Sequence, residues 1–139
     1  MFEKTCKFHP ANHIFGTRDD DDFRWMTYYE FYDIVNRTRN ILAHLGVKKG
    51  DRVASISNNR WEWAAVTYAT MSLGAQVVPM YEQQLEEDWT YIINDAKTKL
   101  IFASTEKIYK TVKPLAGAGV VEHVLCFDAA VDKTHSYHQ

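Results

Sequence analysis

Cysteine is scarce in this chain of 139 residues, and long apolar runs are missing. The two cysteines, Cys6 and Cys126, lie far apart and form no paired framework, which favours a reducing compartment over a secreted, disulfide-stabilised domain. No stretch approaches the roughly 20 apolar residues that a membrane-spanning helix needs. The opening MFEKTCKFHP carries charges without a following apolar run, so we expect no secretory signal. These absences predict a cytoplasmic protein.

A basic surface and a glycine-rich phosphate loop are also missing. The formal charge is -2 and the isoelectric point is near 6.3, so nucleic acid is not an expected partner. The six glycines form neither a GxxxxGK nor a GxGxxG pattern, and no serine stands in a GxSxG motif. Cys6, His9 and His13 have spacings that suit a metal, but no fourth ligand stands nearby. The residues themselves therefore indicate no catalytic, cofactor-binding or metal-binding site.

The composition is that of one packed globular unit. Hydrophobic residues make up 46% of the chain and charged residues 24%, which is typical of a domain with a buried core. We expect residues 1–26 to form an irregular segment with a solvated acidic loop at residues 19–22. We expect residues 129–139 to form a polar tail in which His135 and His138 are exposed.

Residues 27–128 alternate between helical and extended patterns. Thr27 and Glu30 form a capping box before a helical apolar stripe, and Gly46 ends that helix in a left-handed cap. The segment DRVASIS, residues 51–57, then has the composition of a buried strand.

A second helix is predicted directly after this strand. Asn59 and Glu62 form a variant of the capping box at its start, and Gly74 ends it. The next strand covers residues 75–81. Because Pro79 cannot donate a hydrogen bond to a neighbouring strand, it should lie at an edge of the sheet or at the exit of the strand.

The same unit then repeats. A helix from residue 86 leads to a strand at residues 99–104, and a further helix, marked by Ile108, Val112 and Leu115, leads to a final strand at residues 121–128. This alternation predicts an α/β fold with an open, mainly parallel sheet and flanking helices. Ligands in such sheets bind beyond the carboxyl ends of the strands. Asn58 and Tyr81 are therefore possible residues of a ligand rim.

Three stretches resemble the N-terminal region of the AMP-forming adenylating enzymes and, among them, the long-chain fatty acyl-CoA synthetases: WMTYYEF, GVKKGDRVASISNNRWEW and LGAQVVPMYEQQL, the last followed by YIINDAKTKLIFAS. The resemblance covers roughly residues 15–104 and implies that residues 27–128 are part of that family's N-terminal α/β domain. It implies a reaction in which ATP and a fatty acid give an acyl-adenylate, whose acyl group passes to coenzyme A. ATP, Mg²⁺ and coenzyme A are thus implied for the complete enzyme, which is expected in the cytoplasm or peripherally at a membrane.

The resemblance also indicates parts of the family pattern that this chain does not contain. The family's phosphate-binding loop, ribose-binding acid and catalytic lysine would all lie beyond residue 139. We therefore expect a fragment that is inactive alone, in which ISNNRWEW is chiefly a strand-to-helix connector. Such a fragment would expose apolar surface and self-associate. The alternative is a standalone α/β module for ligand or protein binding, because a fold does not determine a function.

Overall fold

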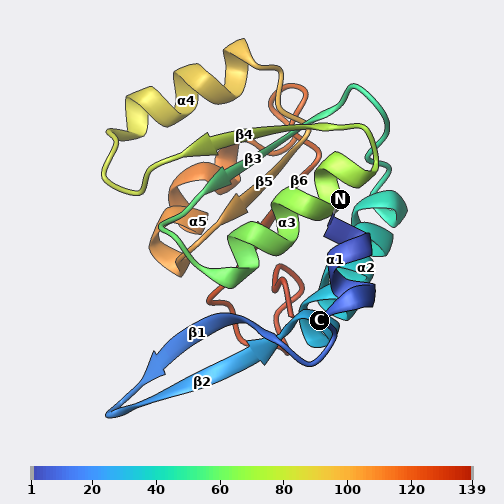
Figure 1. The fold of residues 1–139 in the computed structure, drawn as a ribbon. Coiled ribbons are helices and arrows are strands. Elements are labelled where there is room, and N and C mark those ends of the chain that lie inside the picture. Colours follow the sequence, from blue (N-terminus) through green and yellow to red (C-terminus); the bar gives the residue numbers. More distant parts are fainter. Residues whose placement is uncertain (1, 139) are drawn as a thin grey trace.

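The computed structural model describes residues 2–138, which form an α/β body and a hairpin that projects from it (Figure 1). Within these residues, no helix is both long enough and apolar enough to cross a membrane. The elements follow in this order: α1 (Phe2–Phe8), β1 (His13–Asp19), β2 (Asp22–Thr27), α2 (Tyr28–His44), β3 (Arg52–Ile56), α3 (Trp61–Ser72), β4 (Gln76–Met80), α4 (Glu86–Asp95), β5 (Leu100–Ala103), α5 (Glu106–Val112), the 3-10 helix η1 (Lys113–Leu115) and β6 (His123–Cys126).

Four parallel strands form the sheet of the body, in the order β4-β3-β5-β6. The register pairs Val53 of β3 with Val77 on one side and with Leu100 on the other. The outer strand β4 contains Pro79, as expected for a residue that cannot donate to a neighbouring strand. The predicted open, mainly parallel sheet with flanking helices is therefore confirmed.

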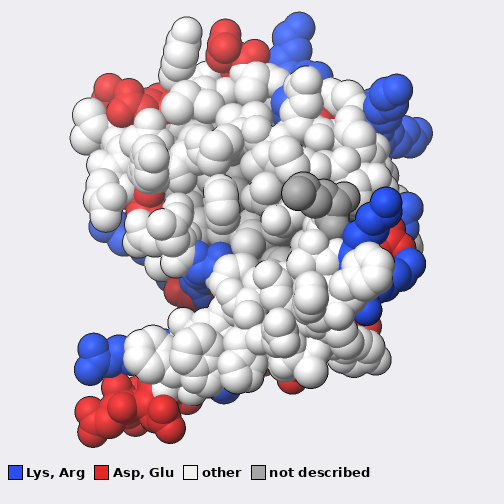
Figure 2. Space-filling model, viewed as in Figure 1, with Lys and Arg blue, Asp and Glu red and all other residues white. Residues whose placement is uncertain are grey.

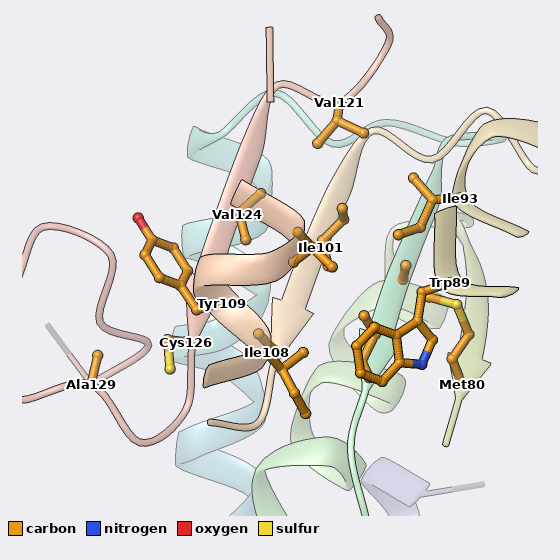
Figure 3. Packing of buried hydrophobic residues seen from close by; sticks show 14 residues of the cluster. Met80, Trp89, Ile93, Ile101, Ile108, Tyr109, Val121, Val124, Cys126 and Ala129 are labelled. Atoms are coloured by element: carbon orange, nitrogen blue, oxygen red, sulfur yellow. The ribbon is translucent and has the colours of Figure 1, made fainter. Parts of the chain in front are cut away.

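Apolar side chains cover both faces of this sheet. On one face, α4 and α5 pack against the central strands, and Figure 3 shows Trp89, Ile101 and Ile108 in this cluster. On the other face, α2 and α3 contribute Phe31 and Val66 to a second cluster. The body is thus a three-layer structure in which helices cover a buried parallel sheet on both sides.

Three of the predicted helix caps are present. Thr27 Oγ1 accepts a hydrogen bond from the Glu30 N–H, and the Glu30 carboxylate accepts one of 2.7 Å from the Thr27 N–H, which completes the capping box of α2. Gly46 and Gly74 follow α2 and α3 with φ angles of 79° and 69°, in the left-handed region that favours glycine. These turns lead the chain from each helix into the next strand.

The segment at residues 1–26 is not irregular, contrary to our expectation, in the part that is described. It contains α1 and an antiparallel hairpin of β1 and β2, with the acidic residues 19–22 exposed at its tip. The hairpin was missed because apolar residues occupy both of its faces, which removes the alternation that identifies a strand. Phe15 packs inward, 4.9 Å from the Phe31 ring, whereas Trp25 is exposed on the outer face.

The segment at residues 129–138 is only in part the exposed polar tail that we expected, because residues 130–134 are exposed whereas Ser136 and Tyr137 are buried. Tyr137 is only 8% exposed, and its ring packs against Phe102 and Phe127 at centroid distances of 5.9 and 5.2 Å. Its hydroxyl oxygen lies 2.8 Å from Oγ1 of Thr38 in α2. Tyr137 therefore belongs to the second core cluster.

The histidines of the tail are also held against the body. The His135 ring stacks on Tyr109 at 4.0 Å, and its Nε2 lies 3.0 Å from Oε1 of Glu106. His138 is exposed, although its ring lies 5.8 Å from that of Trp61. The expectation of an exposed histidine is therefore confirmed for His138 and wrong for His135, because the partners of His135 come from α5, which is distant in the sequence.

The burial of Tyr137 predicts a loss of stability at alkaline pH. Burial raises the pKa of this phenol from 10.0 to about 12, because the phenolate would lose its hydration. Between these pH values the unfolded chain releases the proton while the folded chain keeps it, so the free energy of unfolding falls as the pH rises. We expect this group to contribute a loss of about 2 kcal/mol over that range, measured by urea unfolding. A Tyr137→Phe variant with the same alkaline loss would contradict this assignment.

Candidate functional site

The carboxyl ends of the parallel strands meet at one edge of the sheet. The strand that follows β3 in the chain, β4, lies on one side of it, whereas β5 and β6 lie on the other side, so the strand order changes direction between β3 and β5. Ligands in open α/β folds bind outside the carboxyl ends of the strands at such a point. Asn58, after β3, donates from its backbone N–H and from Nδ2 to the two oxygens of Glu82, at 2.9 and 2.8 Å. Tyr81, after β4, is 73% exposed. Both predicted rim residues thus lie in loops at this edge, but the amide of Asn58 is already bound by Glu82.

Asn59 does not cap α3, contrary to our prediction. The N-cap is Arg60, with an extended backbone, and no side chain accepts a hydrogen bond there. Glu62 does not reach back to Asn59, because both of its carboxylate oxygens accept hydrogen bonds from Arg60. The helix therefore begins one residue later than predicted.

Arg60, Glu62 and Asp128 form a charged group at this edge, which we call the arginine cluster. Arg60 Nε and Nη2 donate to the two oxygens of Glu62, and Nη1 donates to Asp128 Oδ1, all at 2.8 Å. The Glu62 side chain is 6% exposed, whereas that of Asp128 is 45% exposed. Because Asp128 follows β6, the cluster joins the loop after β3 to the segment after β6.

The electrostatics of the cluster keep Arg60 charged and in place. Its hydrogen bonds to Glu62 raise the pKa of the guanidinium against the opposing effect of burial, and the bond to Asp128 adds to this rise. The guanidinium carbon lies 5.3 Å from the centre of the Phe127 ring, a cation–π distance. Since three of its nitrogens donate to carboxylates, Arg60 is bound within the protein and not offered to a ligand.

Arg60 and Asp128 were not predicted as members of the site. Arg60 stands two residues before Glu62, a spacing at which side chains do not face each other on a regular helix. Asp128 is 68 residues away from Arg60 in the sequence. Because Asp128 ends a predicted strand, the sequence places it at the carboxyl edge of the sheet. Its pairing with Arg60 could be predicted only if the order of the strands in the sheet were known.

A cleft of about 780 Å³ lies between the hairpin and the start of α3. Phe15, Thr17 and Arg24 of the hairpin line one wall, and residues 59–64, including most of the arginine cluster, line the other. Figure 2 shows the hollow between the projecting hairpin and the body. The cleft therefore adjoins the edge at which ligand binding is expected.

A family model described as AMP-binding enzyme matches residues 2–138. The chain belongs to the AMP-binding enzyme family. Fatty acyl-CoA synthetase B of Dictyostelium discoideum is 31% identical over 138 residues, which cover 95% of this chain and 20% of that protein. Long-chain-fatty-acid–CoA ligase FadD15 of Mycobacterium bovis is 36% identical over 77 residues, which cover 55% of this chain and 13% of that protein. This chain thus spans about a fifth or less of the length of these relatives.

The fold agrees with solved structures of the family. A Mycobacterium tuberculosis fatty acyl-CoA synthetase superposes with a TM-score of 0.80 at 23% identity, over 91% of this chain and 26% of that chain. At this identity the match establishes the fold. The resemblance of the three sequence stretches to an N-terminal portion of AMP-forming synthetases is therefore confirmed.

The two predicted capping boxes should respond differently to truncation. Thr27→Ala removes an acceptor that the first turn of α2 uses, and we expect a loss of about 1 kcal/mol. Asn59→Ala should cost less than about 0.5 kcal/mol, because Asn59 caps no helix. Chemical unfolding of both variants makes the comparison. Equal losses at the two positions would contradict the assignment of Arg60 as the N-cap of α3.

Removing Arg60 alone should destabilise the protein more than removing its whole pair. Arg60→Met removes both hydrogen-bond donors of the buried Glu62 carboxylate and leaves only His138, whose Nε2 lies 3.9 Å from Oε1, so we expect a loss of about 3 kcal/mol. The double variant Arg60→Met/Glu62→Leu should lose less, since it buries no charge. Asp128→Asn, at a half-exposed position, should cost less than about 1 kcal/mol. Strictly additive losses in this double-mutant cycle would exclude the coupling.

Proposed function

We propose that this chain forms the N-terminal part of an AMP-forming long-chain-fatty-acid–CoA ligase. The support is the family match over residues 2–138, together with relatives whose names state this activity. In the proposed reaction a fatty-acid carboxylate attacks the α-phosphate of ATP, which gives an acyl-adenylate and pyrophosphate. The thiol of coenzyme A then attacks the acyl carbonyl, and AMP leaves as the thioester forms.

Within that enzyme, we assign a positioning role to the arginine cluster. It holds the loop after β3 against the segment after β6, at the edge where ligands bind in open α/β sheets. Among residues 2–138, no three His, Cys, Asp or Glu side chains gather as metal ligands. We propose that ATP, Mg²⁺ and coenzyme A are bound mainly by the remaining, larger part of the enzyme.

We also propose that the chain is inactive alone. Nucleotidyl transfer needs preorganised donors or cations that stabilise the charge developing on the phosphates. The sequence contains no glycine-rich phosphate loop, and Arg60, the arginine nearest to the predicted rim in sequence, already binds two carboxylates. Asn58 and Tyr81 carry no charge that would serve this purpose. They are proposed to lie at the rim of the fatty-acid or nucleotide site and not to act in catalysis.

A standalone α/β binding module is the second candidate. The observation in its favour is that helices cover both faces of the sheet within residues 2–138. Ser136 also forms a parallel bridge with Cys126 of the outer strand β6. Against it, exposed apolar side chains such as Met71 of α3 and Tyr91 of α4 offer the surface that the predicted self-association would use.

An exchange assay separates the two candidates. The purified chain should show no palmitate-dependent exchange between ATP and labelled pyrophosphate, whereas the complete Dictyostelium relative serves as the positive control. A chimaera in which this chain replaces the aligned segment of that relative should regain exchange. Exchange by the chain alone would contradict its inactivity. A folded chimaera without exchange would contradict the ligase proposal and favour the binding module.

A further inference from the structure

The outer face of the hairpin exposes aromatic side chains that the core does not use. Phe15 and Met26 point toward the body and pack at the border of the second core cluster. On the opposite face, Phe23 is 51% and Trp25 is 54% exposed. A two-stranded ribbon with one buried face normally carries polar residues on the other. We call the side chains of His13, Phe23 and Trp25 the aromatic face.

The aromatic face is preorganised around Trp25. Its indole lies nearly parallel to the rings of His13 and Phe23, whose centroids are 5.2 and 5.7 Å away. Gly16 lies directly opposite Trp25 in the strand register, and a Cβ at Gly16 would come within 2.7 Å of the indole. Glycine therefore lets the ring lie flat across β1. A row of rings that is already ordered loses little side-chain entropy when a partner binds.

Negative charge lies at the end of the aromatic face. Residues 19–22 are four consecutive aspartates, all exposed, and Figure 2 shows them as a red lobe at the tip of the hairpin. Arg18 is folded onto the turn, where its Nε donates to the carbonyl oxygen of Asp20. Arg24 lines the cleft on the inner face. Four carboxylates thus outnumber the two guanidinium groups of the hairpin.

We propose that the aromatic face and the acidic tip together bind a basic polypeptide segment, rich in lysine and arginine. A guanidinium or ammonium group is attracted to the exposed face of an indole or phenyl ring. Neighbouring cations of the same segment would pair with the aspartates of the tip, whose charge repels nucleic acid and anionic lipid. The hairpin is a two-stranded sheet, so an extended segment would also find main-chain partners along its edge. This proposal does not depend on the proposed ligase activity.

The experiment measures binding of a fluorescently labelled decalysine peptide to the full chain by anisotropy, at low and at physiological ionic strength. Trp25→Ala and the double variant Asp20→Asn/Asp21→Asn should each raise the Kd about fivefold. Salt should weaken binding to the parent more than binding to the double variant. Tyr91→Ala and Glu87→Gln are matched controls, because both residues are exposed on α4, which lies on the other side of the body in Figure 1. Both controls should leave the Kd unchanged.

Several outcomes would overturn the proposal. Absence of binding at low salt, or equal binding of decaglutamate, would do so, and so would hairpin variants with the Kd of the parent. Binding to phosphatidylserine vesicles that is lost in Trp25→Ala would identify a lipid surface as the partner instead. A dimer in light scattering that is lost in the same variant would identify a second copy. If Trp25→Ala lowers the melting temperature, the aspartate variant decides, because its side chains are exposed and support no packing.

Discussion

The two central strands of the sheet impose the arrangement of the whole body. β3 and β5 have strands on both sides and helices over both faces, so their backbone groups must pair with neighbours and their side chains must be buried. Parallel pairing requires a crossover between successive strands. The crossovers are α3, α4 and α5. The step from β3 to β4 runs in one direction across the sheet, and the steps to β5 and β6 run in the other. Therefore α3 covers one face of the sheet, while α4 and α5 cover the other.

The same constraint determines the chemistry of the carboxyl edge. Loops that leave buried strands begin in a region poor in water, and a charge placed there needs a partner. Glu62 is buried at the start of α3 and is neutralised by Arg60, which also reaches Asp128 beyond β6. At the neighbouring loop, Glu82 accepts both hydrogen bonds of Asn58. The charged and amide groups of this edge thus fasten loops to one another.

The sequence allowed prediction of the parts of the fold that local rules control. Thr27, Glu30, Gly46 and Gly74 have their predicted roles, because capping and the left-handed conformation depend on a few neighbouring residues. Features that depend on long-range packing were missed. Tyr137 is buried through contacts with α2, β5 and the segment after β6, which no pattern in a polar tail could reveal. At the candidate site, Asn58 and Tyr81 could be placed at the rim because ligands bind beyond the carboxyl ends of parallel strands. The arginine cluster could not be predicted without the order of the strands in the sheet.

The hairpin differs from the body because packing explains only one of its faces. Phe15 and Met26 attach it to the second core cluster, and the alternation of a strand would then leave the other face to polar side chains. Instead that face carries Phe23 and Trp25, and Gly16 provides the space in which the indole lies flat. Glycine inside a strand lowers stability, so this arrangement weakens the hairpin as an isolated element. Exposed rings held in a row at such a cost serve no packing within residues 2–138, which favours a contact made outside these residues.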